Sequence, residues 1–270
     1  MAMTGQAPQA GVSLDPQVYQ SALQAQLGDQ PTEAFHVTLT RKGLISGIVC
    51  LLAGLGFIVG ALISIPQTAE ISSALVLSVI GLGLLAGAVY CLLYGVIYKD
   101  WHVYIYERGF IYTRGKAPQV FRWDQVEAIW FQITRHYRNG IYTGTTYMYR
   151  VRRNDGQEVV LNNRFAKIAQ LGELVNERIC QTKLPQVIAA LNAGQTVTFG
   201  PLSLSQAGLQ NAKGALLPWQ EITGVDVQNG YIAISKAGKW LKWSNQPVAN
   251  IPNALLFINL ARSVLRQRSA

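Results

Sequence analysis

The chain has 270 residues, of which 50% are hydrophobic and only 14% are charged, and its formal net charge at neutral pH is +9. Soluble globular domains carry about a quarter of charged residues, so this composition excludes an ordinary protein that is soluble along its whole length. The three cysteines form no Cys-x-x-Cys pair and no Cys/His cluster. This argues against a disulfide framework and a zinc site and favours a reducing compartment.

The first 40 residues are polar and rich in Gln, Ala and Pro. Because such a composition offers little apolar surface to bury, we expect residues 1–40 to form a mobile segment. One or two helical turns are expected after Asp15, since Pro16 suits the first position of a helix.

Two long apolar runs follow, at residues 43–65 and 73–97, and Glu70 is the single fully charged residue between Gly43 and Ile97. A helix rises about 1.5 Å per residue, so each run is long enough to cross the roughly 30 Å hydrocarbon core of a bilayer. The sequence therefore predicts two transmembrane helices within residues 41–98.

The flanks of these helices predict their orientation. Arg41 and Lys42 precede the first helix, Lys99 follows the second, and the segment between the helices has no Lys or Arg. From Lys99 onward the chain has 21 Lys and Arg against 10 Asp and Glu. The positive-inside rule places both termini in the cytoplasm. An aromatic belt is expected where the second helix leaves the bilayer, at Tyr90, Tyr94, Tyr98 and Trp101.

Pairs of glycines recur at four-residue spacing within the apolar runs: Gly43 and Gly47, Gly56 and Gly60, Gly83 and Gly87. Small residues at this spacing let helices approach closely in lipid, and we expect them to pack the two helices against each other rather than to form a dimer. Neither helix has an ionisable residue at mid-membrane, which disfavours a transporter or channel.

Residues 99–184 change to short alternating segments typical of strands. The segment "WHVYIYE" (101–107) is followed by "FIYT", "QVFRW" and "EAIWFQIT", by a long loop "RHYRNGIYTG" (135–144), and by "TTYMYRVRR". Asp155-Gly156 predicts a hairpin turn into "QEVVLNN". Apolar residues then recur at helical spacing from Ile168 to Ile179. We interpret residues 99–184 as a β-meander closed by a helix.

A second set of such segments occupies residues 195–270, after a short connecting helix expected at 185–194. Its predicted strands are "TVTFG", "LSLS", "ALLPW", "ITGVDVQ", "YIAISK" and "WLKWS", with a hairpin turn at Asn229-Gly230. A final amphipathic helix follows, with Asn250 or Asn253 as its N-cap. The second set thus repeats the order of the first set, in which short strands are followed by a closing helix.

One short element supports an internal repeat. Gly109 precedes Trp123-Asp-Gln-Val126, and Gly208 precedes Trp219-Gln-Glu-Ile222. We expect both glycines to supply backbone freedom at tight turns. The two tryptophans are expected to fill the core where each meander meets its helix.

This order of elements, together with the Gly…Trp-x-x-[Val/Ile] element, resembles uncharacterised bacterial membrane proteins with two amino-terminal transmembrane helices and cytoplasmic pleckstrin-homology (PH)-like domains. The resemblance covers roughly residues 43–267. It implies a membrane α-hairpin joined to a mainly antiparallel α+β cytoplasmic region made of tandem PH-like modules, in a bacterial cell membrane. The family has no assigned activity, so the resemblance implies no catalytic residues.

The residues themselves also point away from catalysis. There is no G-x-S-x-G, no H-E-x-x-H and no phosphate-binding G-x-x-x-x-G-K-[ST] motif. We therefore expect neither an enzyme nor a bound metal or cofactor. The candidate contacts for an anionic ligand are basic residues of the first module, whose guanidinium and ammonium groups suit phosphate: Arg114, Lys116, Arg135, Arg138, Arg150 and Arg152.

These observations lead to one functional hypothesis and one alternative. The chain is predicted to be an integral membrane protein whose cytoplasmic modules act as a binding or scaffolding unit for a protein partner. The alternative is recognition of anionic lipid headgroups through the basic loops of the first module. Nucleic acid is a less favoured partner because no recognition motif accompanies the positive charge.

Overall fold

The computed structural model describes residues 15–37, 41–64, 71–98, 100–115 and 117–269. The chain divides into two compact units. The helical unit comprises His36–His102 with Thr113–Lys116, and the sheet unit comprises the remainder of the chain.

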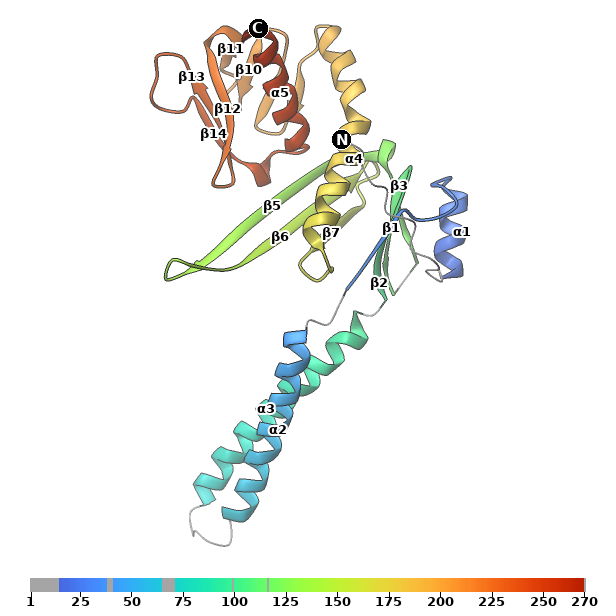
Figure 1. The fold of residues 1–270 in the computed structure, drawn as a ribbon, viewed down its shortest axis with the longest axis vertical. Helices are drawn as coiled ribbons and strands as arrows, with labels where there is room; N and C mark the ends of the chain where they lie inside the picture. Colours follow the sequence, from blue (N-terminus) through green and yellow to red (C-terminus); the bar gives the residue numbers. More distant parts are fainter. Residues whose placement is uncertain (1–14, 38–40, 65–70, 99, 116, 270) are drawn as a thin grey trace, which may run out of the picture. The chain divides into compact units, whose positions relative to one another are not determined.

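The helical unit contains two long antiparallel helices, α2 (Arg41–Ser64) and α3 (Ile71–Ile97), which lie side by side (Figure 1). Their most apolar windows, Ile45–Ile63 and Ala74–Cys91, have mean hydropathies of 2.4 and 2.3, and only 17% of each window is buried. Both helices are long and apolar enough to cross a membrane, which confirms the two predicted helices to this extent. Their bounds agree with the expected runs to within two residues at each end.

The two helices approach each other most closely at Gly54 and Gly81. A Cβ built on Gly54 would lie 3.0 Å from the Gly81 carbonyl oxygen, and one on Gly81 would lie 2.8 Å from a side-chain carbon of Ile58. By contrast, Gly56, Gly60, Gly83 and Gly87 have no atom within 4 Å of such a Cβ. The expected packing of the pair is therefore present, but those four predicted glycines do not form it.

Aromatic rings follow the end of α3. The ring centroids of Tyr94 and Tyr98 lie 4.4 Å apart, and those of Tyr98 and Trp101 lie 4.7 Å apart. The Arg114 guanidinium lies 4.5 Å from the centre of the Trp101 ring. This stack joins the helix end to the first strands and matches the position of the expected aromatic belt.

Residues 15–35 of the sheet unit form a helix and most of a strand, where a mobile segment was expected over residues 1–40; residues 1–14 and 38–40 lie outside the described residues. Helix α1 (Pro16–Gln24) starts as expected after Asp15, whose side chain accepts a hydrogen bond from the Gln17 N–H. Val18, Ala22 and Leu27 are buried against Tyr104, Tyr106 and Ile111. A strand, β1 (Glu33–His36), then pairs with the meander. These side chains, together with the buried Phe35 of β1, explain why a mostly polar segment packs against the sheet.

The first part of the meander forms two antiparallel sheets. The first sheet has the order β1-β2-β3-β4, with β2 at Trp101–Tyr106, β3 at Gly109–Arg114 and β4 at Gln119–Arg122. A 3-10 turn, η1 (Trp123–Gln125), leads into the second sheet, β5-β6-β7. Its strands are β5 (Val126–Arg138), β6 (Ile141–Arg153) and β7 (Glu158–Asn162). The turn at Asp155-Gly156 lies between β6 and β7 as predicted.

Residues 135–144, expected to be a long loop, belong to an extended hairpin instead. The β5 and β6 strands are each 13 residues long and pair to their ends, where Arg138 faces Ile141. Asn139 and Gly140 both have positive φ, 50° and 78°, the conformation of a two-residue hairpin turn. Figure 1 shows this hairpin extending beyond the rest of its sheet. We call residues 132–148 the arm.

Helix α4 (Ile168–Asn192) is continuous, so the connecting helix expected at 185–194 is not a separate element. Its first half buries Leu171, Val175 and Ile179 against the sheets just described, and its second half packs Leu184, Val187 and Leu191 against the next core. This apolar face outweighs the cost of Pro185 inside the helix, about 3 kcal/mol in an exposed helix.

The second part of the meander also forms two antiparallel sheets. One has the order β11-β10-β9-β8 and the other β12-β13-β14. The strands are β8 (Val197–Phe199), β9 (Leu202–Leu204), β10 (Gly208–Asn211), β11 (Leu216–Pro218), β12 (Ile222–Gln228), β13 (Tyr231–Lys236) and β14 (Ser244–Pro247). The turns η2 (Trp219–Glu221) and η3 (Val248–Asn250) precede β12 and the final helix α5 (Ala254–Ser269).

Two sequence predictions for this part were wrong. "WLKWS" was expected to be a strand, but residues 237–243 form a loop and only Ser244 begins β14. Asn253 lies just before α5, but its side chain hydrogen-bonds to β5 rather than to the helix end. The Asn229-Gly230 turn is present as predicted, with φ of 50° and 80°.

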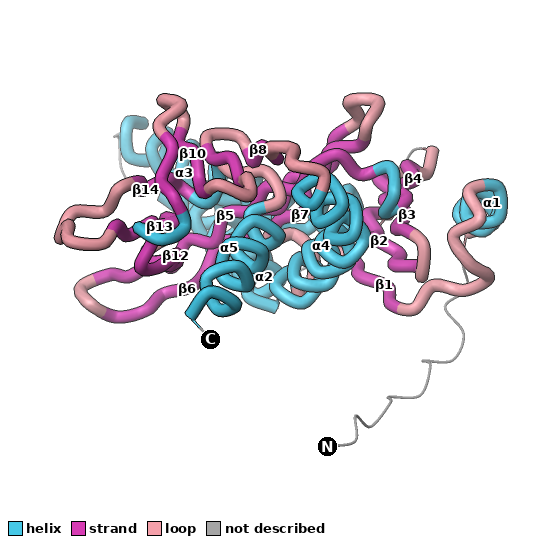
Figure 2. Tube along the Cα trace, turned by 90° about the horizontal axis from the view of Figure 1, so that it is seen from above, coloured by secondary structure: helices cyan, strands magenta, loops and turns pink. Residues whose placement is uncertain are grey.

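We refer to α1 through α4, outside the helical unit, as the N-terminal region, and to β8 through α5 as the C-terminal region. Each has a four-stranded sheet, a 3-10 turn that begins with a tryptophan, a three-stranded sheet and a closing helix. Each closing helix follows a residue with φ of 53°, Lys167 or Asn253. Figure 2 shows α4 and α5 side by side between the sheets.

Candidate functional site

The tryptophan of each region is buried and held by its indole N–H. Trp123 is 5% exposed and its Nε1 donates to the Glu107 carbonyl at 3.1 Å. Trp219 is 3% exposed and its Nε1 donates to the Ser205 carbonyl at 3.0 Å. Both therefore serve the core, and neither is available to a ligand.

Gly109 and Gly208 have a different role from the one expected. Neither has a φ in the left-handed region. Instead, a Cβ on Gly109 would lie 2.4 Å from the Phe121 carbonyl oxygen, and one on Gly208 would lie 2.1 Å from the Leu217 carbonyl oxygen. The glycines are required because a neighbouring strand passes too close for any side chain, not because a turn needs backbone freedom.

Two of the predicted basic contacts lie together. The β5–β6 register places Trp130 opposite Arg150 and Ala128 opposite Arg152, so all four side chains share one face. The guanidinium carbons of Arg150 and Arg152 lie 4.5 and 4.9 Å from the Trp130 ring centre. Arg152 also forms a 2.8 Å ion pair with Glu127. Both cations are thus already engaged by groups of the protein.

The remaining predicted contacts do not join this pair. Arg135 lies five positions after Trp130 with no bulge between them, so it points to the opposite face of β5. Arg138 is exposed at the end of the arm. Arg114 belongs to the helical unit, where it lies over Trp101, and Lys116 is outside the described residues. The predicted cations that the structure describes in the sheet unit therefore do not converge on a single anion-binding site.

The arm is a surface that the sequence analysis missed. Five of its large apolar side chains are exposed: Ile133, Tyr137, Ile141, Tyr142 and Met148, with Ile141 at 70%. Between residues 132 and 148 the sequence has Arg135, His136 and Arg138 but no Asp or Glu. The arm is therefore both apolar and cationic. Asn139-Gly140 between alternating residues was the signal that would have predicted it.

The arm has internal contacts that keep it extended. His136 Nε2 lies 2.7 Å from the Thr146 hydroxyl, and the rings of Tyr137 and Tyr142 pack edge to face at 5.9 Å. The Tyr142 hydroxyl lies 2.7 Å from that of Thr145. The arm thus presents its exposed side chains from an ordered ribbon.

The strand edges of the arm are largely uncovered by other strands. β5 is the outer strand of its sheet, and β7 pairs with β6 only from Met148 to Arg152. Near the base, the Asn163 side chain hydrogen-bonds to the Tyr147 N–H and the Thr145 carbonyl at 2.6 and 2.8 Å. Beyond this cap, residues 141–144 of β6 pair only with residues 136–138 of β5, and among the described residues no strand pairs with the outer edge of residues 132–138.

The base of β5, by contrast, is covered by the C-terminal region. The Asn253 N–H donates to the Ile129 carbonyl at 2.8 Å, and its Oδ1 accepts from the Ile129 N–H at 3.1 Å. Its Nδ2 donates to the Glu127 carbonyl at 3.3 Å. Asn253 thus satisfies the edge of β5 much as a neighbouring strand would.

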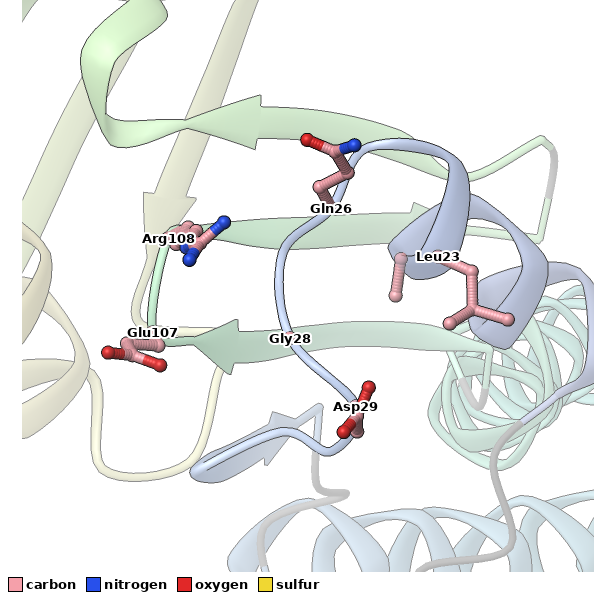
Figure 3. A pocket seen from close by; sticks show the side chains of 7 residues that line it. Leu23, Gln26, Gly28, Asp29, Glu107 and Arg108 are labelled. Carbon is pink, nitrogen blue, oxygen red and sulfur yellow. The ribbon is translucent and has the colours of Figure 1, made fainter.

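A shallow cavity of about 350 Å³ lies between the end of α1 and the β2–β3 turn. Figure 3 shows that the charged side chains lining it, Asp29, Glu107 and Arg108, do not converge on one point. Gln26 and Leu23 complete much of the lining. No group of three His, Cys, Asp or Glu side chains arranged to bind a metal occurs among the described residues. The cavity therefore lacks the arrangement that a reaction or a charged ligand needs.

The structure thus defines a protein with two helices suited to a membrane and a mostly antiparallel sheet unit whose most distinctive exposed feature is the arm. The chain belongs to the family of unknown function DUF6585, whose family model covers residues 1–270. No curated protein and no solved structure matches the chain.

Proposed function

We propose that the chain is a membrane-anchored binding protein, with α2 and α3 across the bilayer and the sheet unit and both termini in the cytoplasm. The exposed apolar surface of the two helices supports the membrane assignment, since a surface such as that of Leu52, Leu62 and Val79 is stable in hydrocarbon but not in water. Arg41, Lys42 and Lys99 support the orientation.

We further propose that each region is a PH-like module and that the two are copies of one unit. The support is topological: four strands, three strands and a closing helix occur in that order twice. Matching details add to it. A bulge follows the tryptophan turn in both, between Val126 and Ala128 and between Ile222 and Gly224. Such coincidences of register are typical of duplicated structure rather than of two unrelated sheets.

The function that the geometry favours is docking of a protein partner on the arm. The single observation that carries this proposal is an ordered ribbon with uncovered strand edges, exposed apolar side chains and no acidic residue. Uncovered edges accept an added strand through backbone hydrogen bonds, while side chains on alternate positions supply specificity. The partner is therefore an extended segment that carries acidic and apolar side chains.

A lipid headgroup pocket in the N-terminal region is less well supported. Arg150 and Arg152 are engaged by Trp130 and Glu127, and Arg135 lies on the other face. Apolar side chains along both strands also suit a protein strand better than a small anionic group. Catalysis is not part of the proposal, since no convergent set of reactive side chains supports it.

Site-specific photocrosslinking in native membranes tests this docking. A photoreactive phenylalanine analogue replaces Ile141, the residue after the Asn139-Gly140 turn, in the full-length chain. The matched control carries it at Tyr231, which follows the Asn229-Gly230 turn of the shorter hairpin. We expect a discrete protein adduct at position 141, none at 231, and loss of the adduct in Arg135→Glu/Arg138→Glu.

The crosslinked protein is then purified and titrated against the full-length chain in nanodiscs. Tyr142→Ser should weaken this binding by about thirtyfold or more if the arm is the centre of the interface. Replacing residues 135–145 by Asn-Gly should abolish it, because Thr134 and Thr146 already face each other and a two-residue turn can close them. Unchanged binding by the shortened chain, or adducts with lipid alone, would contradict the proposal.

A further inference from the structure

A second exposed apolar feature lies in the C-terminal region, in the β13–β14 loop at residues 237–243. Trp240 is 90% exposed and Leu241 is 62% exposed. No other large hydrophobic side chain among the described residues is as exposed as Trp240. A tryptophan fully presented to water at the tip of a loop is costly to leave uncovered.

The loop is fixed at both ends rather than loosely attached. The Ala237 N–H donates to the Glu221 carbonyl at 2.8 Å, and the Trp243 N–H donates to the Ile234 carbonyl at 2.8 Å. The Trp243 side chain packs against the core of the C-terminal region. Trp240 and Leu241 are therefore held outward by an anchored loop while Trp243, three residues later, is held inward.

Two lysines flank the apolar tip in the sequence. Lys239 and Lys242 are the immediate neighbours of Trp240-Leu241, and residues 236–247 contain no Asp or Glu. The Lys242 ammonium donates to the Ser235 hydroxyl at 2.9 Å. Lys236 pairs with Glu221 at 2.7 Å, so these two charges offset each other. The outer end of the loop is thus positively charged.

We propose that this loop is a docking site for an anionic bilayer surface, with Trp240 and Leu241 in the interfacial layer and Lys239 and Lys242 against the lipid phosphates. Tryptophan prefers the headgroup level of a membrane, and each lysine close to an anionic surface contributes to attraction. Because we propose that α2 and α3 cross a bilayer, a lipid surface is a partner that this loop can meet. A compact apolar tip flanked by two lysines suits this planar surface, whereas the arm distributes its apolar side chains along two strands.

The test uses the full-length chain in phosphatidylcholine nanodiscs, with Cys50, Cys91 and Cys180 replaced by alanine and Ala237→Cys carrying an environment-sensitive fluorophore. Vesicles containing phosphatidylserine are then added, and a second preparation places phosphatidylserine in the nanodisc itself. We expect a blue shift of the emission and protection from a water-soluble quencher in at least one of these two settings. Phosphatidylcholine vesicles should produce neither change.

Point variants identify which side chains are responsible. Trp240→Ser/Leu241→Ser should remove the shift. Lys239→Gln/Lys242→Gln should weaken binding to the added anionic vesicles by about thirtyfold, from two lysine contributions of roughly 1 kcal/mol each. Lys213→Gln, an exposed lysine of another loop in the same region, is the matched control and should change little.

Three outcomes would overturn the inference. The fluorophore could remain accessible to the quencher in both anionic preparations, or phosphatidylcholine vesicles could produce an emission shift of the same size. The third such outcome is an emission shift that persists in Trp240→Ser/Leu241→Ser. The inference does not depend on the arm. Loss of partner binding in the arm-shortened chain would leave the vesicle result unchanged, so the two proposals fail separately.

Discussion

The N-terminal and C-terminal regions share an order of elements, yet they differ at the places where each meets its surroundings. The β5–β6 hairpin has strands of 13 residues, whereas β12 and β13 have 7 and 6. Conversely, the β6–β7 connection is a tight turn at Asp155-Gly156, whereas the corresponding β13–β14 loop presents Trp240. The shared parts are buried and the differing parts are exposed, so core packing constrains the fold while hairpin ends are free to acquire function.

Removal of either buried tryptophan should have the largest effect on the stability of its region. Trp123→Ala and Trp219→Ala should each lower the free energy of unfolding by about 3–5 kcal/mol, since each removes a large buried side chain and its indole hydrogen bond. Chemical denaturation of the full-length chain in nanodiscs measures this loss. If the two regions are equivalent units, the losses are similar; a loss confined to one variant would contradict the equivalence.

The two strand glycines give the next largest effect. Gly109→Ala and Gly208→Ala should each cost about 1–3 kcal/mol, because the added Cβ meets a backbone carbonyl that cannot move aside without shifting its strand. Gly224→Ala is the control, since its Cβ would meet only the flexible Asp226 carboxylate at 3.3 Å. Equal stability of the three variants would show that the close strand approach is not required.

Much of this architecture follows from local signals in the sequence. The two apolar helices, the turns at Asp155-Gly156 and Asn229-Gly230, and most strands were predicted because their patterns are set by neighbouring residues. The arm was missed because the basic, aromatic and glycine-containing stretch at residues 135–144 resembles a loop, although its Asn-Gly turn indicated a hairpin. The course of residues 15–37 was missed because Val18, Ala22 and Leu27 bury themselves only against strands about 80 residues away.

The candidate site was harder to predict than the fold. Sequence proximity grouped six basic residues, but strand alternation separates Arg135 from Arg150 and Arg152, and this separation depends on the register of β5 and β6. The exposure of Trp240 was not predicted either, because the pattern of "WLKWS" is typical of a strand. Only the packing of Trp243 against the core shows that Trp240 lies in a loop and is exposed. In both cases the positions of the side chains depend on tertiary contacts.

The junction between the two regions provides a third, smaller perturbation. Asn253→Gly keeps a residue that tolerates the φ of 53° but removes the side-chain bonds to Ile129 and Glu127. We expect a loss of about 1–2 kcal/mol and faster hydrogen exchange at the Ile129 amide. Asn245→Gly, at an exposed position of β14, is the control for local changes and should leave that amide protected. An unchanged exchange rate would indicate that the regions are held together elsewhere.

Alkaline pH should distinguish the two regions by the smallest of these changes in stability. Burial raises the pKa of Tyr106 and of Tyr149 to about 12, with Glu173 adding to the shift at Tyr149, and both lie in the N-terminal region. The C-terminal region has only Tyr231, which is 42% exposed. An acid whose folded pKa is raised stabilises the fold fully below its unfolded pKa of about 10 and loses that contribution as the pH approaches 12.

The N-terminal region should therefore weaken first, by about 1 kcal/mol per buried tyrosine near pH 11. Hydrogen exchange resolved by peptide reports each region separately at this pH. Tyr149→Phe should reduce the alkaline loss, whereas Tyr231→Phe should not, and simultaneous weakening of both regions in the unsubstituted chain would contradict this account. Because Tyr149 packs its ring directly against Gly172 of α4, its ionisation also loosens the helix that continues into the C-terminal core. If hydrogen exchange in the C-terminal region rises only at a higher pH than in the N-terminal region, this later rise would measure how much of the C-terminal region's stability depends on the N-terminal region.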